Sequence, residues 1–281
     1  MKTYFFLFLI ILFFISKDAS ISFSEYPWTH NSTKSDTIAN NIPVPNGYIR
    51  TKVSENSFQH WLRNLPLKDN KSAVYLYNGE KKFNQSAHFA VINIDVGNKD
   101  LQQCADAVIR LRAEYLYSIG NYDAIHFNFT SGHAAYFKKW IDGFRPIVKG
   151  NNVDWDKIEK HDSSYRNFRK YLNIVFSYAG SYSLSKELKP ISTGEMKIGD
   201  VFIKGGFPGH AVIVVDIATH TETGKKIFLI AQSYMPAQDI HILNNIINRK
   251  LNPWYDEDFG NNLLTPEWIF KANQLKRFNT D

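Results

Sequence analysis

Hydrophobic residues along this chain follow two patterns, a helical period and short apolar runs, and each pattern predicts a type of element. A 3.6-residue period runs from Asp100 to Ser118, where Cys104, Val108, Leu111 and Tyr115 fall on one face of a helix. The segment opens with the letters DLQQ, which have the spacing of a capping box. We therefore expect a helix with its N-cap at Asp100, which packs Cys104 against the rest of the protein.

Short apolar runs bounded by turn residues predict the strands. Three of these runs follow each other between Val201 and Gln232, and only short glycine-rich or polar segments separate them, so we expect three successive antiparallel strands. Other helices are predicted over residues 57–65, 136–141 and 164–176, and other strands over 73–77, 89–95 and 125–129. The fold class we expect is α+β, with a central helix packed on an antiparallel sheet or half-barrel.

The first forty residues predict an exported protein. Tyr4 to Ile15 is an unbroken apolar run of twelve residues after a short basic start. A helix of that length reaches about 18 Å, whereas a hydrocarbon core is about 30 Å thick, so we expect a secretory signal peptide over residues 1–20. A membrane anchor is the alternative. Residues 21–41, rich in Ser, Thr and Asn, predict an unfolded leader before a single domain at 42–281.

Composition narrows the possible functions. The chain has 281 residues, of which 44% are hydrophobic, enough for a real core. Its net charge of +6 is spread along the sequence, so we expect no nucleic-acid groove. We expect no cofactor, no membrane insertion after signal cleavage, a periplasmic or extracellular location, and a monomer. Asp239 and His241 lie on one strand face without a third ligand, so we expect no metal.

The chain has one cysteine, Cys104, which excludes an internal disulfide. A lone thiol in an exported protein is either a small buried side chain or a nucleophile. His210 opens a Val- and Ile-rich strand, and Gln232 ends the next strand. A neighbouring imidazole turns a thiol into a nucleophile by accepting its proton, and a polar third group orients the imidazole.

The segment GDVFIKGGFPGHAVIVVD, residues 199–216, resembles the histidine region of papain-like cysteine peptidases and amidases, especially the cell-wall amidohydrolase branch. The segment CADAVIR, residues 104–110, is similar to the sequence around the nucleophile of that group. The resemblance implies a papain-like core with Cys104 as nucleophile, His210 as base and Gln232 as the orienting residue. Between Cys104 and His210 it requires a helical insertion, which we place at about residues 120–183.

A longer resemblance covers residues 42–270. The chain resembles an uncharacterised family of secreted bacterial proteins known only as a domain of unknown function. The segments that carry this resemblance are SFQHWLRNLPL (57–67), DLQQCADAVIRLRAEYLY (100–117), HFNFTSG (126–132), the histidine segment above, AQSYMPAQDIHIL (231–243) and TPEW (265–268). The family brings no established activity.

From these patterns we expect an exported thiol-dependent hydrolase of amide bonds, with a peptide or cell-wall substrate. The residues expected to contact substrate lie beside the three candidate catalytic residues; they are Gln103, Phe207, Gly209, Ser233 and Tyr234. The alternative is a non-catalytic module that binds a glycan or peptide on the same scaffold, in which Cys104 only fills space.

Overall fold

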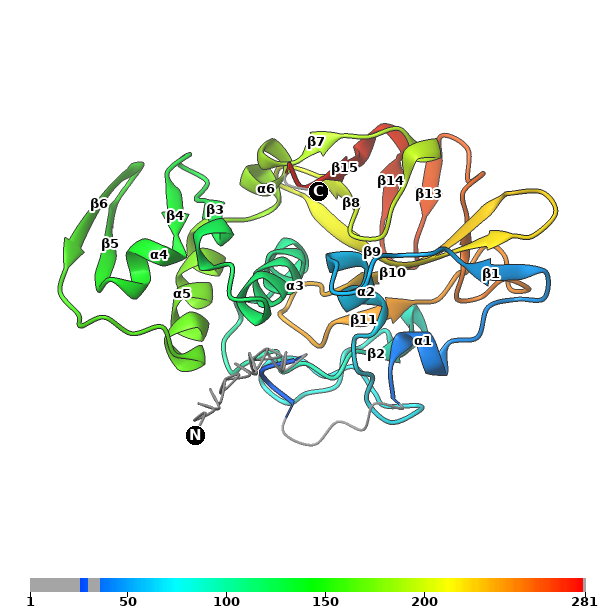
Figure 1. The fold of residues 1–281 in the computed structure, drawn as a ribbon, viewed down its shortest axis with the longest axis horizontal. Coiled ribbons are helices and arrows are strands. Elements are labelled where there is room, and N and C mark those ends of the chain that lie inside the picture. Colours follow the sequence, from blue (N-terminus) through cyan, green and yellow to red (C-terminus); the bar gives the residue numbers. More distant parts are fainter. Residues whose placement is uncertain (1–25, 30–35, 280–281) are drawn as a thin grey trace, which may run out of the picture.

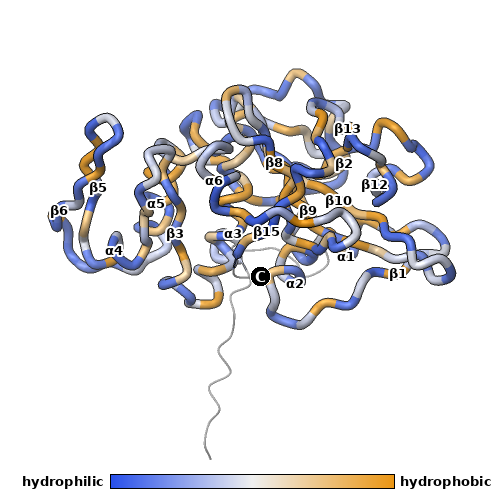
Figure 2. The backbone as a smooth tube through the Cα atoms, turned by 90° about the horizontal axis from the view of Figure 1, so that it is seen from above, coloured by the Kyte–Doolittle hydropathy of each residue, from blue (hydrophilic) through white to orange (hydrophobic). Residues whose placement is uncertain are grey.

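The computed structural model describes residues 26–29 and 36–279. A large antiparallel sheet forms the centre of the molecule, and the long helix α3 (Cys104–Ser118) lies beside it (Figure 1). The expected α+β class, with a central helix packed on an antiparallel sheet, is confirmed. Hydrophobic residues concentrate on the middle strands of this sheet, and hydrophilic residues prevail in the outer loops (Figure 2).

The centre of the sheet consists of β8 (Val201–Lys204), β9 (His210–His220) and β10 (Lys226–Gln232). They pair antiparallel in sequence order, as predicted, and nearly all their residues are buried. Beyond β10 lie β11 (His241–Leu243) and β2 (His88–Val91), and beyond β8 lie β15 (Leu275–Arg277) and β7 (Lys189–Pro190); β1 (Tyr48–Arg50) pairs with β9, and β12 (Tyr255–Asp256) with β10. Because β9 and β10 are neighbours, the start of one lies beside the end of the other.

Helix α3 starts three residues later than the DLQQ pattern predicts. Its first residue is Cys104 and its N-cap is Gln103, whose backbone N–H donates to the Asp106 carboxylate at 3.1 Å. Asp100 does not cap the helix. Its carboxylate accepts instead from the backbone N–H of Ala237 at 2.7 Å, a contact between segments far apart in the sequence. Cys104 is therefore at the first helical position, where backbone N–H groups have no intrahelical acceptor.

Shorter helices and a hairpin complete the main body. They are α1 (Ile38–Asn41), α2 (Phe58–Arg63), α6 (Ser181–Glu187) and the hairpin of β13 (Asn262–Leu264) with β14 (Ile269–Lys271). The strand expected over residues 73–77 does not form: Tyr75 and Leu76 make only isolated bridges, to Lys81 and Gln238.

Residues 122–178 form a lobe to one side of the main body (Figure 1). It contains the hairpin β3 (His126–Asn128) and β4 (Ala134–Tyr136), helix α4 (Phe137–Ile141), the hairpin β5 (Phe144–Lys149) and β6 (Asn152–Lys157), and helix α5 (Tyr165–Tyr178). The segment expected as a helical insertion thus holds two helices, as predicted, together with two hairpins.

Part of the segment expected as an unfolded leader is folded. The Tyr26 hydroxyl donates to the carbonyl oxygen of Trp61 at 2.9 Å, and the Trp28 indole N–H donates to that of Asn93 at 2.7 Å. Ile38 in α1 is fully buried. The polar composition of residues 21–41 did not predict that Tyr26, Trp28 and Ile38 would be part of the folded domain. The expected signal peptide lies outside the described residues. Within the part of the chain that the structure describes, no helix is long and apolar enough to cross a membrane.

Candidate functional site

The Cys104 sulfur lies against the backbone that flanks His210. Its Sγ is 4.0 Å from the carbonyl oxygen of Gly209, and the side chain is almost completely covered. Burial, and secondarily the negative charge of Asp106, raises the pKa of the thiol to about 11, although the backbone N–H groups of Ala105 and Ala211 act in the opposite direction. The resting thiol is therefore protonated at neutral pH.

The His210 ring is held by a hydrogen bond to Gln232. Its Nε2 lies 2.8 Å from Gln232 Oε1, and the residue is 1% exposed. An amide oxygen only accepts, so the proton of the neutral ring is on Nε2 and the lone pair is on Nδ1. Burial lowers the pKa of His210 to about 4; the Lys82 charge acts in the same direction and the Gln232 hydrogen bond opposes it.

Glu267 determines which way the Gln232 amide points. Gln232 Nε2 lies 2.8 Å from Glu267 Oε2, and this carboxylate oxygen also accepts from Lys82 Nζ at 2.5 Å. Because an ionised carboxylate accepts hydrogen bonds only, the amide nitrogen must face Glu267 and the amide oxygen must face His210. His241 is the last member of this polar network. Its Nε2 lies 3.4 Å from Gln232 Nε2 and 3.5 Å from Lys82 Nζ.

The sequence patterns did not identify Glu267, Lys82 or His241 as parts of this network. Glu267 stands in the TPEW segment, which signalled family membership without a chemical role. Lys82 carries no local signal at all. A buried lysine is rare unless it is paired, so the burial of Lys82 indicates that it has a partner. This burial is visible in the structure but not in the sequence.

Aromatic rings surround His210. The ring centroids of Tyr234, Trp268 and Phe270 lie 4.8, 5.2 and 5.7 Å from that of the imidazole. Among the expected substrate contacts, Tyr234 therefore lies at the imidazole, and Gly209 lies at the sulfur. Phe207 is 90% exposed on the loop before His210.

The remaining two expected substrate contacts, Ser233 and Gln103, form hydrogen bonds with other groups of the protein. Ser233 is fully buried, and its hydroxyl lies 3.0 Å from the carbonyl oxygen of Gln102 and 2.8 Å from that of Gln238. It links the loop after β10 to the segment before α3, and its side chain has no exposed surface in this structure. The Gln103 amide donates to the Asp100 carboxylate at 3.1 Å and is partly exposed.

Asp239 and His241 do not form a metal site together. The Asp239 carboxylate accepts from Lys68 Nζ at 2.9 Å and from the backbone N–H of Tyr75 at 3.0 Å. The His241 ring makes its Nδ1 contact with the backbone oxygen of Asp239, at 2.8 Å, and not with the carboxylate. Among the described residues, no group of three or more His, Cys, Asp or Glu side chains has the arrangement that a metal ion needs.

The fold and the site define an α+β protein in which a lone cysteine at the head of the central helix lies beside a buried polar network on the sheet. The chain belongs to the family described as Domain of unknown function (4846), whose profile matches residues 38–277. The expected membership in an uncharacterised family is confirmed. No curated protein and no solved structure matches the chain.

Proposed function

We propose that this protein is an exported thiol-dependent hydrolase of amide bonds, with Cys104 as nucleophile, His210 as general base and Gln232 as the residue that orients the imidazole. The hydrogen bond from His210 Nε2 to Gln232 Oε1 carries the proposal, because it leaves the basic Nδ1 for the thiol. The 4.0 Å approach of Sγ to Gly209, the residue before His210, supports it. So does the resemblance to papain-like enzymes.

The shifted pKa values favour proton transfer during attack over a preformed ion pair. Both resting groups are neutral, since burial disfavours thiolate and imidazolium alike. As sulfur bonds to the substrate carbonyl carbon, the thiol proton passes to Nδ1 of His210. The imidazolium then donates that proton to the leaving amine. Water, deprotonated by the same nitrogen, hydrolyses the thioester and releases the acid and the free thiol.

The Gln232 hydrogen bond favours the imidazolium that forms in this step, against burial and the Lys82 charge, which both disfavour it. Gln232 Oε1 accepts from Nε2, while Glu267 accepts from the other end of the same amide and polarises it. Lys82 neutralises Glu267 in the resting state. Gln232 and Glu267 thus act on His210 alone and are positioning residues.

The head of α3 supplies stabilisation for the tetrahedral oxyanion. At the first helical position the Cys104 backbone N–H has no intrahelical acceptor and lies at the positive end of the helix. The partly exposed Gln103 amide is the candidate second donor. The substrate class, a peptide bond of cell-wall material, rests on the expected export and on the resembling branch of amidases.

The direct test is hydrolysis of peptides by the full-length mature protein. Peptidoglycan fragments and a mixed peptide library are incubated with wild type, Cys104→Ala and His210→Ala, and new amines are identified by mass spectrometry. We expect cleavage by the wild type only, with each variant reduced at least about 1,000-fold. Equal cleavage by wild type and Cys104→Ala would refute the proposal.

The neutral resting pair also favours a second candidate, a peptide- or glycan-binding module in which the thiol has no role. The exposed Phe207, three residues before His210, is the observation that supports this candidate. In that case Cys104→Ala binds the same fragments with unchanged affinity, and no fragment is cleaved by the wild type.

A further inference from the structure

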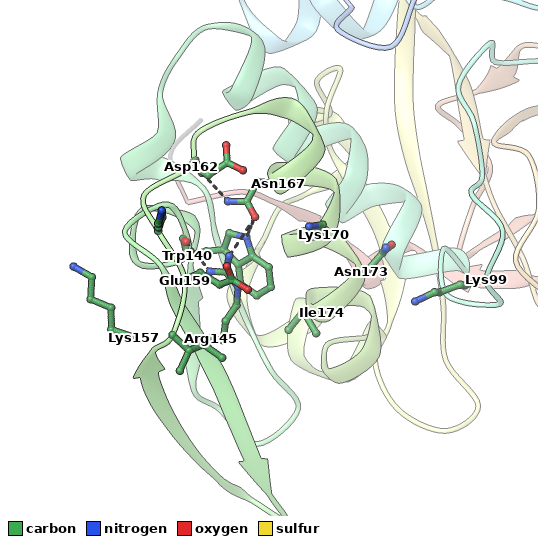
Figure 3. Close-up of a pocket in the computed structure, with 12 residues that line it drawn as sticks. Lys99, Trp140, Arg145, Lys157, Glu159, Asp162, Asn167, Lys170, Asn173 and Ile174 are labelled. Atoms are coloured by element: carbon green, nitrogen blue, oxygen red, sulfur yellow. Dashed lines mark hydrogen bonds between the residues drawn. The ribbon is translucent and has the colours of Figure 1, made fainter.

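A cleft lies in the lobe, between α5 and the segment that follows β6 (Figure 3). Its volume is about 940 Å³. Five cationic side chains and two carboxylates line it, an excess of three positive charges; they are Lys99, Arg145, Lys157, Lys160 and Lys170, with Glu159 and Asp162. The cleft therefore concentrates positive charge in a hollow large enough for several residues of a bound chain.

Arg145 is fixed at the floor of this cleft with no carboxylate partner. Its guanidinium carbon is 3.9 Å from the centre of the Trp140 ring. Its Nη1 donates to the carbonyl oxygens of Trp140 and Phe144 at 2.9 and 2.8 Å, and its Nη2 donates to Asn167 Oδ1 at 3.3 Å. All three acceptors are neutral, and no ion pair joins Arg145 to another described residue. Burial lowers the pKa of the Arg145 guanidinium, and the nearby charges of Glu159 and Asp162 oppose this shift.

The floor is rigid before any ligand arrives. The Trp140 indole N–H donates to the same Asn167 oxygen at 2.9 Å, and both residues are buried. A half-buried guanidinium that is already oriented, hydrogen-bonds only to neutral acceptors and has the Glu159 and Asp162 charges near it without a direct ion pair gains free energy when an anion binds it directly.

The lysines at the rim are free to bind the same anion. Lys99, Lys160 and Lys170 are exposed, and their amines make no hydrogen bond or ion pair within the described ranges. The Asp162 carboxylate accepts from the backbone N–H of Ser164 at 2.8 Å, at the positive end of α5, and also interacts with the charges of Lys170 and Arg145. It offsets one of the five positive charges, so the excess of three remains.

We propose that this cleft binds the carboxylate groups of an acidic peptide, as a subsite for the substrate that Cys104 cleaves. The inference rests on the proposed function for its choice of a peptide over other anions. Lys99 connects the two places, because it precedes Cys104 by five residues and so lies within about 18 Å of it along the chain. An extended peptide of about five residues spans that distance, so the acidic segment binds several residues away from the amide bond that is cut.

The test is binding of a fluorescein-labelled hexaglutamate peptide to the full-length mature chain carrying Cys104→Ala, so that no turnover interferes. Fluorescence anisotropy is measured at low and physiological salt. We expect Lys160→Gln/Lys170→Gln to weaken binding about tenfold, and Arg145→Gln to weaken it at least as much. Lys189→Gln/Lys250→Gln, which removes the same charge from exposed positions elsewhere, is the matched control and should change the affinity less than twofold.

Three results would overturn the inference: no hexaglutamate binding at low salt, equal weakening by the control pair, or binding of a polyphosphate of equal charge in place of hexaglutamate. The double lysine variant keeps the result interpretable if Arg145→Gln fails to fold. Because binding is measured without catalysis, the failures separate. If the wild type cleaves neutral peptides but does not bind hexaglutamate, only the proposed subsite is refuted. If the chain binds hexaglutamate but the wild type cleaves no peptide, the proposed hydrolase activity and the link of the cleft to Cys104 are refuted.

Discussion

At the residue scale, a histidine that is buried in its neutral form makes stability depend on pH. The pKa of His210 falls from an ordinary value near 6.5 to about 4 in the folded state. Between these values the unfolded chain binds a proton that the folded protein does not, so stability is full above about pH 6.5 and is lost as pH falls toward 4. The contribution of His210 amounts to about 3 kcal/mol at the low end.

His210→Gln should therefore flatten the fall in unfolding free energy between pH 7 and pH 4.5, measured by urea denaturation. His241, whose pKa burial also lowers, retains its own share of the slope. The exposed His133 provides the control, since His133→Gln should leave the slope unchanged. An identical slope in His210→Gln and wild type would show that His210 is not buried neutral.

The pair of Lys82 and Glu267 supports a second prediction at this scale. Lys82 is 6% exposed, and Glu267 is its only carboxylate partner among the described residues. Removing one member leaves the other charge buried alone, so Lys82→Met and Glu267→Gln should each cost about 3–5 kcal/mol. The double variant should cost clearly less than the sum, which a double-mutant cycle in urea measures. Additive costs would mean that the two side chains do not interact.

In the hydrolase, Glu267→Gln has a second consequence. Without the carboxylate, the Gln232 amide is free to turn its nitrogen toward His210, which would place the ring proton on Nδ1 and remove the base. We expect kcat to fall about 100-fold with KM nearly unchanged, and Glu267→Asp to restore part of it. A variant that is only destabilised would recover full kcat at low temperature, where it is folded.

At the element scale, the start of α3 shows both the reach and the limit of sequence patterns. The apolar period identified the helix and its buried face, because periodicity depends on neighbours within the helix. The DLQQ spacing placed the N-cap wrongly at Asp100, because the carboxylate is taken by Ala237, a tertiary partner that no local pattern reveals. The strands β8 to β10 were predictable because each is a short apolar run bounded by turn residues, which is also a local signal.

The network at His210 was predictable only in part. His210 is recognisable in the sequence because it begins an apolar strand, and Gln232 because it ends the next one. Glu267 and Lys82 come from loops that are distant in the sequence, and only the folded sheet brings them to Gln232. The resemblance to papain-like enzymes predicted the catalytic roles of these residues, whereas the hydrophobic patterns predicted the helices and strands that carry them.

Asp106, in the first turn of α3, provides the prediction for this helix. Its negative charge contributes to the raised pKa of Cys104. Asp106→Asn retains an acceptor for the Gln103 N–H but removes the charge, so the pKa of Cys104 should fall below about 11 with the fold intact. The pH dependence of iodoacetamide alkylation measures this shift. Asp106→Ala, which loses the cap, should cost about 1 kcal/mol of stability, and an unshifted alkylation profile in Asp106→Asn would exclude the charge effect.

At the scale of the whole molecule, buried polar contacts join the lobe to the main body. Arg110 and Glu114 in α3 are fully buried and pair at 2.7 Å. The Tyr165 hydroxyl in α5 donates to Glu114 at 2.8 Å, and Arg169 pairs with Asp95 at 3.1 Å. The lobe and the main body therefore share one charge network, and we expect them to unfold together.

Tyr165→Phe removes the hydroxyl that links the lobe to Glu114 and should cost about 1–3 kcal/mol. Circular dichroism and tryptophan fluorescence should still report one coincident urea transition, because Arg169 keeps its contacts. Tyr178→Phe, at a half-exposed position in the same helix, should cost little. Two separate transitions in the wild type would show that the lobe folds independently.

The central claim, that His210 activates Cys104, is tested most directly by the rate of Cys104 alkylation at pH 7. A thiol with a pKa of about 11 is ionised to only about one part in ten thousand at this pH, so without assistance it reacts very slowly. We expect native wild type to react with iodoacetamide about 100-fold faster than His210→Ala. Equal rates in the two proteins, or alkylation only after denaturation, would contradict the claim and leave Cys104 as a buried packing residue.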